Sequence, residues 1–301
     1  MSMPGVFKGR LSIPVIGAPL FIISVPDLVI AQCKAGVVGS FPALNARPPA
    51  LLDEWLVRIQ QELAAYDRAN PERPSAPFAV NQIVHRSNNR LEQDLAVCEK
   101  HKVPIIITSL GAREELNQAA HRWGGIVFHD VINQKFAHKA VEKGADGLIL
   151  VSAGAGGHAG EISPFAFVAE TRQWFDGPIA LSGAIGNGRA IRAARLLGAD
   201  FAYIGSAFIA TAGSGDAVHA IWADEFFSAL LRARIPNLEM HVYGNGVHAN
   251  GLKDRSGTPF GTWQYRFIDW FRDLGFLGKA GEQTKAARDI ATFVATPLKT
   301  Q

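Results

Sequence analysis

Short apolar runs alternate with amphipathic segments along most of the chain. Several runs, such as IIIT at 105–108 and GLILV at 147–151, are largely apolar and do not alternate with polar residues, as expected of strands covered on both faces of a parallel sheet. The pattern predicts eight strands, at Val15–Ala18, Val37–Ser40, Phe78–Val80, Ile105–Thr108, Ile126–His129, Gly147–Val151, Ile179–Leu181 and Phe201–Ile204.

A segment with helical spacing of apolar residues follows each of these strands. Eight strand–helix pairs in succession favour an α/β fold of the closed (β/α)8 TIM-barrel type over an open, doubly wound sheet. The predicted helices are Pro26–Ala35, Ala50–Ala69, Asn88–Lys100, Glu114–Arg122, Lys135–Lys143, Pro164–Phe175, Gly188–Leu197 and approximately Gly215–Arg234.

One internal repeat supports the barrel. EKGADGLILVSAG and LLGADFAYIGSAF share a helix-ending glycine, an Ala-Asp turn, an apolar strand and a glycine-containing exit. Gly144 and Gly198 are expected in the left-handed conformation that commonly ends helices. The alternative is that Gly-Ala-Asp is only a common turn between a helix and a strand.

The pattern changes after about Arg234, where HVYGNGVHANGLKDRSGTPFGTW is glycine-rich and irregular. We expect residues 1–234 to form the barrel and residues 235–301 to form an appended C-terminal segment that packs on it, a candidate lid. Packing is favoured over membrane-surface binding because Asp269 and Asp273 share the amphipathic segment with Trp263 and Trp270.

Composition and charge limit the classes of function. The 301 residues are 48% hydrophobic, which is enough for the core of one barrel domain, and the net charge of +3 is scattered, which predicts no nucleic-acid partner. No stretch is long and apolar enough to span a membrane, and the N-terminus lacks the apolar region of a signal peptide. Cys33 and Cys98 are interpreted as buried free thiols, so a cytoplasmic location is expected. A homodimer is compatible with the sequence.

In a parallel barrel, the loops that leave the carboxyl ends of the strands build the active site. The exits of strands seven and eight, LSGAIGNG and YIGSAF, are where such barrels hold a phosphate with backbone N–H groups. Gly183 and Gly205 would allow close approach of the backbone, and Ser206 would add a hydroxyl. The alternative is ordinary loop chemistry without a ligand.

The exit of strand six, SAGAGGHAGE, surrounds one histidine, His158, with glycines. It contains G-x-G-x-x-A at 154–159, but no helix starts directly after it and no acidic residue ends a following strand, so a dinucleotide site is not expected. A histidine with a pKa near neutrality can act as a general base, and we favour this role over a structural one.

His129 and Asp130, at the exit of strand five, either line the site or pair with each other. Neither a metal site nor a serine nucleophile elbow is predicted.

In this order, these segments resemble the nitronate monooxygenase family, formerly called 2-nitropropane dioxygenases. The resemblance covers roughly residues 10–235, with IPVIGAPL, FAVNQ, GAGGHAG, LSGAIGNG and GADFAYIGSAF as its anchors. It implies an FMN-binding (β/α)8 barrel with a small second domain and no metal. It also implies a set of site residues: Ala18, Pro19 and Leu20 along the flavin ring, Asn81 hydrogen-bonded to the cofactor, Gly156 and Gly157 beside it, His158 as the catalytic base, and Ser182, Gly183, Gly205 and Ser206 around the phosphate.

The implied reaction is the oxidation of an alkyl nitronate, or of the parent nitroalkane, by O2 to a carbonyl compound and nitrite. His158 would remove the α-proton of the nitroalkane, and FMN would carry the redox chemistry. Asp130 is a departure, because some members of the family carry a lysine there, and it leaves the flavin contacts and the subclass open. The main alternative is an NAD(P)H-dependent FMN reductase of the same superfamily, an enoyl-acyl-carrier-protein reductase or a quinone reductase. A non-catalytic barrel is the third reading.

Overall fold

The structure is a computed structural model of the chain, and it describes residues 4–156, 160–209, 211 and 283–295. The chain divides into two units, Met1–Val218 and His219–Gln301. The first contains the barrel, and the described part of the second contains helix α10 (Lys285–Ala295). The predicted boundary at residue 234 lies outside the described residues, so the proposed division at that point stays a prediction.

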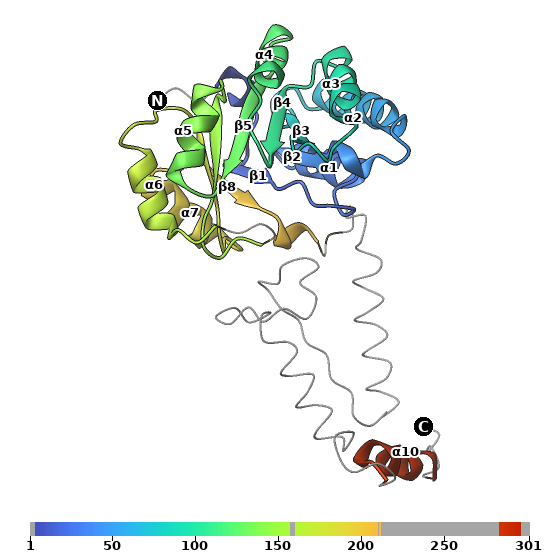
Figure 1. Cartoon of the computed structure of the whole chain (residues 1–301). Coiled ribbons are helices and arrows are strands. Elements are labelled where there is room, and N and C mark those ends of the chain that lie inside the picture. The colour runs from blue at the N-terminus through green and yellow to red at the C-terminus, as the bar shows by residue number, and fades with distance from the viewer. Residues whose placement is uncertain (1–3, 157–159, 210, 212–282, 296–301) are drawn as a thin grey trace. The chain divides into compact units, whose positions relative to one another are not determined.

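Eight parallel strands form one sheet in the order β1-β8-β7-β6-β5-β4-β3-β2. A bridge between Ile16 and Val38 joins β1 to β2, and there the amide of Gly17 donates to the carbonyl of Val38 at 2.8 Å. This closes the ring and confirms the predicted (β/α)8 TIM barrel (Figure 1). The strands are β1 (Val15–Gly17), β2 (Gly39–Pro42), β3 (Phe78–Ile83), β4 (Ile105–Ser109), β5 (Ile126–Val131), β6 (Gly147–Val151), β7 (Ile179–Ser182) and β8 (Phe201–Ile204).

Helices surround the strands, and those that follow the first seven strands differ from the predicted ones only at their ends (Figure 1). Gly144 and Gly198 adopt φ of +87° and +109°, which confirms the expected left-handed helix ends. The predicted helix near Gly215–Arg234 lies outside the described residues. The helices are α1 (Pro26–Lys34), α2 (Leu51–Ala69), α3 (Leu91–Lys100), α4 (Glu114–Arg122), α5 (Gln134–Glu142), α6 (Pro164–Thr171) and α7 (Gly188–Leu197), with short 3-10 turns η1 (Gly5–Phe7), η2 (Ala43–Asn45) and η3 (Ser206–Phe208).

The barrel interior is filled by alternate residues of the strands. Phe7, which lies before β1, packs against Phe201 and Phe128 with ring centroids 4.8 Å and 6.2 Å away, so it closes the amino-terminal end of the barrel. Because side chains alternate between the two faces of a strand, this core defines the inward-facing positions. The strand residues in it are Ile16, Val38, Ala79, Ile105, Ile107, Phe128, Ile149, Ala180 and Phe201.

A second apolar layer lies between the strands and the helices, and it includes both cysteines. Cys33 and Cys98 are buried free thiols, as predicted, and burial raises the pKa of each to about 12. Among the described residues, no helix has both the length and the apolar character needed to cross a membrane.

The Gly-Ala-Asp repeat has the same structural role twice. Asp146, before β6, accepts a hydrogen bond of 2.7 Å from the amide of Val127 in the neighbouring strand β5. Asp200, before β8, accepts one of 2.8 Å from the amide of Ile179 in the neighbouring strand β7. Each aspartate therefore links the starts of two adjacent strands, and the repeat is more than a common turn.

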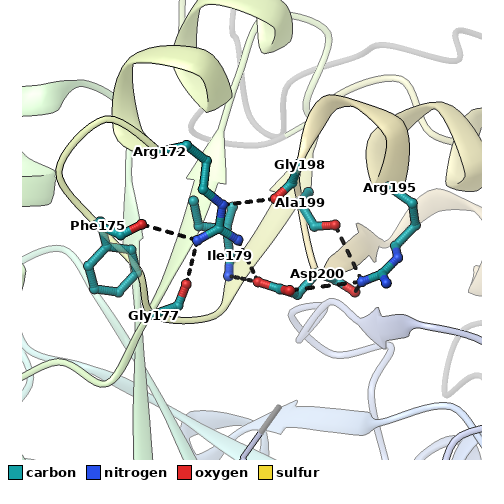
Figure 2. Close-up of polar contacts among 8 residues, drawn as sticks. All are labelled: Arg172, Phe175, Gly177, Ile179, Arg195, Gly198, Ala199 and Asp200. Atoms are coloured by element: carbon teal, nitrogen blue, oxygen red, sulfur yellow. Dashed lines mark hydrogen bonds and ion pairs between the residues drawn. The ribbon is translucent and has the colours of Figure 1, made fainter. Parts of the chain in front are cut away.

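Each of these aspartates also contacts a basic side chain from a helix. His121 Nε2 lies 2.8 Å from Asp146, and Arg172 Nη2 donates to Asp200 at 2.5 Å. Figure 2 shows that the Arg172 guanidinium also reaches backbone carbonyls of the turns around it, those of Phe175, Gly177 and Gly198, at 3.2, 2.6 and 2.9 Å. This network lies at the amino-terminal end of the barrel, away from the expected active site, and it serves the stability of the fold.

Candidate active site at the carboxyl ends of the strands

Mostly small or polar residues occupy the inner face of the barrel near the carboxyl ends of the strands. Each lies two positions after an inward-facing core residue of its own segment and therefore points inward as well. These residues are Ala18, Ser40, Asn81, Ser109, Asp130, Val151, Ser182 and Tyr203.

A row of hydrogen bonds crosses three neighbouring strands at this level. The side-chain amide of Asn81 on β3 donates to the carbonyl of Ile107 at 3.1 Å and to the hydroxyl of Ser109 on β4 at 2.8 Å. The Ser109 hydroxyl then donates to the carboxylate of Asp130 on β5 at 2.5 Å. Both amide hydrogens of Asn81 are thus used within the protein, so its oxygen Oδ1 is the atom left to meet a ligand, as an acceptor.

Tyr203 faces the same interior from β8. Burial raises the pKa of its hydroxyl well above the ordinary value, and the negative charge of Asp130 raises it further. Tyr203 is therefore a neutral phenol at physiological pH, and alternation along the strands places it on the same inner face of the barrel as Asp130.

His129 does not belong to this group. β5 runs to Val131, two residues beyond the predicted strand end, so His129 and Asp130 are adjacent strand residues that point to opposite faces. His129 lies among the helix-side contacts, 2.5 Å from the hydroxyl of Thr108, and burial lowers its pKa to about 4. The prediction that the two residues line one site or pair with each other is therefore wrong for His129, whereas Asp130 does face the barrel interior.

The loop after β1 carries Ala18, Pro19 and Leu20, the three residues expected along the flavin. The amide of Ala18 donates to the carbonyl of Ile204 at 2.7 Å, which ties the start of the loop to β8. All three residues are partly exposed. The loop therefore lies over the carboxyl end of the barrel, with side chains accessible to a ligand there.

Asn45 holds the far end of this loop, and sequence reasoning missed it. Its side-chain amide donates to the carbonyls of Leu20 and Ser24, each at 2.9 Å, and accepts from the amide of Ile22 at 3.0 Å. Asn45 lies in η2, at the exit of β2, where no site residue was predicted. An asparagine in a short turn directly after a strand is the only signal the sequence offered.

Gly205 brings the exits of β8 and β1 together. A Cβ built on Gly205 would lie 3.1 Å from Leu20 Cδ2 and 3.5 Å from Ala18 Cβ, so the backbone of β8 approaches the loop as closely as glycine allows. Ser206, next along the chain, is exposed, and its side chain makes no hydrogen bond to the residues that the structure describes. Gly205 and Ser206 thus lie beside the loop predicted to contact the flavin.

Gly183 follows β7 and packs against the exit of β6. It adopts φ +144°, and a Cβ there would overlap the Ser152 hydroxyl and lie 2.8 Å from the carbonyl oxygen of Ala153. Ser152 in turn donates to the carbonyl of Ser182 through its amide at 3.0 Å and its hydroxyl at 2.5 Å. Packing alone therefore requires glycine at 183, in addition to any approach of a phosphate.

The loop after β6 is described only in part. Gly154 accepts from the amide of Ala184 at 2.9 Å, which joins this loop to the exit of β7, and Gly156 is exposed with open space around its α-carbon. Gly157 and His158 lie outside the described residues, so the base expected at 158 stays a prediction. Among the residues that are described, no three His, Cys, Asp or Glu side chains group to hold a metal ion.

A parallel (β/α)8 barrel with polar groups at its strand ends is the architecture of a TIM-barrel enzyme. Residues 54–225 match the sequence model of the nitronate monooxygenase family, a match that covers more than half of the chain. The chain therefore belongs to the nitronate monooxygenase family.

Two solved structures and one further protein are similar to parts of this chain. A point mutant of FabK from Thermotoga maritima is 25% identical with a TM-score of 0.60, and the match covers 68% of this chain and 65% of that chain. A nitroalkane oxidase from Streptomyces ansochromogenes is 23% identical with a TM-score of 0.61 and 70% coverage of each chain, a likeness that shows the fold. A protein of Rhodococcus jostii (strain RHA1), (3aS,4S,5R,7aS)-5-hydroxy-7a-methyl-1-oxo-octahydro-1H-indene-4-carboxyl-CoA dehydrogenase, is 28% identical over 135 residues, 45% of this chain. The chain spans only 38% of the length of that protein.

Proposed function

We propose that the protein is an FMN-dependent nitronate monooxygenase that oxidises alkyl nitronates, and nitroalkanes, with O2 to carbonyl compounds and nitrite. The observation that carries the proposal is the close approach of Gly205 to Ala18 and Leu20, because it joins the predicted phosphate-binding exit to the predicted ring-binding loop. Membership of the nitronate monooxygenase family supports it.

The described residues suit a flavin mononucleotide. Gly205 leaves room where any side chain would intrude, and the exposed Ser206 has a hydroxyl to offer a phosphate. Asn81 has an acceptor oxygen left over, which suits a donor such as a ring N–H or a ribityl hydroxyl. In the proposal, Ser182, Gly183, Gly205 and Ser206 hold the phosphate, Ala18, Pro19 and Leu20 lie along the ring, and Asn81, Gly156 and Gly157 complete the cofactor site.

When bound, FMN would supply the electron transfer between substrate and O2. The protein would supply the base: neutral His158 takes the α-proton of a nitroalkane at one of its ring nitrogens. A preformed nitronate has already lost that proton and does not need the base. Tyr203, held neutral, would contribute no charge to the barrel mouth.

Substitution of His158 by asparagine tests this assignment. Removing a positioned base typically costs about 10²–10⁴-fold where proton transfer matters, so turnover of the nitroalkane should collapse while turnover of the nitronate falls much less. Both substrates are assayed with flavin content measured in parallel. Equal losses on the two substrates in a folded, flavin-replete His158→Asn protein would remove His158 from the role of base.

An NAD(P)H-dependent FMN reductase of the same superfamily is the second candidate. It is favoured by the relative from Rhodococcus jostii, which is named as a dehydrogenase. The same barrel and the same flavin site would serve it, but reduction would come from the nicotinamide. We also propose a cytoplasmic location and leave a homodimer as the expected oligomer.

A further inference from the structure

We propose that Asn45 is a positioning residue of the cofactor site, which sets the conformation of the loop at 20–24 and thereby the place of Leu20. The proposal rests on the proposed function because it assumes that this loop contacts the flavin. Asn45 itself touches neither the predicted phosphate site nor the inner face of the barrel, and its effect passes through the loop.

The three hydrogen bonds of the Asn45 side chain all go to this loop. Its nitrogen donates to the carbonyls of Leu20 and Ser24, and its oxygen accepts from the amide of Ile22. The loop adds two bonds of its own between Leu20 and Ser24, from the Leu20 amide to the Ser24 hydroxyl at 2.9 Å and from the Ser24 amide to the Leu20 carbonyl at 3.0 Å. Five polar contacts thus define a turn of five residues.

The turn needs such support because of Ile22. Its φ is +57°, a left-handed conformation that a β-branched residue rarely adopts. Its side chain is 54% exposed, so burial of the side chain contributes little to holding it there. The hydrogen bond from the Ile22 amide to Asn45 is therefore the contact that stabilises this backbone conformation.

Arg90 anchors the turn that carries Asn45. Its guanidinium donates to the carbonyl of Ala46 at 2.9 Å and to the carboxylate of Asp94 at 3.0 Å, and the Asp94 side chain is fully buried. The η2 turn is therefore attached to the start of α3 by hydrogen bonds from Arg90, whose guanidinium is held in place by its ion pair with Asp94. The loop at 20–24 is fixed to this rigid part of the barrel at one end and to β8, through Ala18, at the other.

The consequence falls on Leu20, which lies between the two fixed points. Leu20 Cδ2 would be 3.1 Å from a Cβ on Gly205, so a displaced loop would alter the contact between the β1 and β8 exits. Loss of the Asn45 side chain should therefore loosen the cofactor site without changing any residue that contacts the cofactor.

The test compares Asn45→Ala with Asn117→Ala. Asn117, buried on α4, donates to the carbonyl of Lys143 at 2.8 Å, so its removal also deletes a buried amide hydrogen bond, but away from the loop. Two readouts are measured: the dissociation constant of FMN for protein stripped of flavin and retitrated, and amide hydrogen exchange of a peptide covering residues 18–25. We expect Asn45→Ala to weaken FMN binding tenfold or more and to speed exchange in that peptide at least tenfold, and Asn117→Ala to change neither.

Ile22→Asn provides a rescue that a merely structural role would not give. Asparagine tolerates positive φ far better than isoleucine, so adding Ile22→Asn to Asn45→Ala should restore part of the lost FMN affinity and slow the exchange again. Unchanged exchange at 18–25 in Asn45→Ala, or no effect of Ile22→Asn in that background, overturns the positioning role. If Asn45→Ala speeds exchange at 18–25 but the wild-type protein takes up no FMN, the positioning role stands and the proposed function is rejected.

Should Asn45→Ala not fold, Asn45→Asp replaces it. Aspartate keeps the acceptor for Ile22 but cannot donate to Leu20 or Ser24, so it is expected to show the same two effects.

Discussion

Gly205, at the end of β8, lies so close to Leu20 in the loop after β1 that a Cβ on the glycine would be 3.1 Å from the leucine Cδ2. The neighbouring atom is the end of a flexible side chain, and Gly205 does not occupy a left-handed conformation. A substitution at 205 is therefore compatible with folding, although it narrows the gap between the two loops.

Gly205→Asp should abolish flavin retention in a folded protein. The carboxylate would occupy the place where the backbone is expected to approach the phosphate, and it would repel the anion. The visible absorbance of the purified protein reports bound flavin, and circular dichroism reports the fold. Gly5→Asp, at the other end of the barrel with no atom within 4 Å of its Cβ, should keep its flavin. A Gly205→Asp protein with full flavin content would place the phosphate elsewhere.

Gly183→Asp is a weaker test of the same site. The Cβ at 183 would overlap Ser152 in any case, and φ there is +144°, so the variant is expected to lose stability whether or not a phosphate binds nearby. Loss of flavin from that protein would not distinguish the two causes, which is why Gly205 is the better position.

His129 should make the protein less stable in weak acid. Burial lowers its pKa from 6.5 to about 4, so between these values the unfolded chain binds a proton that the folded protein does not. The free energy of unfolding therefore falls as the pH drops through this window, by up to roughly 3 kcal/mol from this residue. Denaturant titrations at pH 7 and pH 4.5 should show a smaller loss for His129→Gln than for wild type, with the exposed His85→Gln as the control. An identical loss in wild type and His129→Gln would contradict the assignment.

Arg172→Met should destabilise the fold while leaving the cofactor site intact. The substitution removes the hydrogen bonds that Arg172 donates to three backbone carbonyls and to Asp200 at the amino-terminal end of the barrel, while the bond from the Ile179 amide to Asp200 remains (Figure 2). We expect a loss of about 2–4 kcal/mol in the free energy of unfolding. Urea unfolding measures it, with Arg192→Met, an exposed arginine of α7, as the matched control. Wild-type stability in Arg172→Met would show that the network contributes nothing.

The barrel was predictable because its strands are apolar on both faces and its helices are amphipathic. These two patterns of apolar residues are easily recognised in the sequence. Strand ends were less predictable. β3 and β5 extend past their last purely apolar residue, so Asn81 and Asp130 lie within strands and not in loops. Alternation along the strand then directs Asn81 and Asp130 inward and His129 outward, a distinction that no composition rule reveals.

The hydrogen bonds that hold the loops of the candidate site could not be predicted from the sequence. Asn45 meets its partners 21 to 25 positions earlier in the chain, and only the closure of β1 beside β2 brings them together. The direction of the hydrogen bonds from Asn81 through Ser109 to Asp130 likewise depends on the register of three strands. Short sequence motifs identified the loops that follow the strands, whereas the hydrogen bonds that fix those loops depend on residues that only the fold brings together.

Anaerobic mixing of the purified protein with a nitronate, and separately with NADH and NADPH, tests the central claim most directly. The absorbance of the bound flavin is followed in each mixture. An FMN-dependent nitronate monooxygenase should be bleached by the nitronate and stay oxidised with either nicotinamide. Rapid bleaching by NADH or NADPH, with none by the nitronate, would contradict the account and establish the reductase in its place.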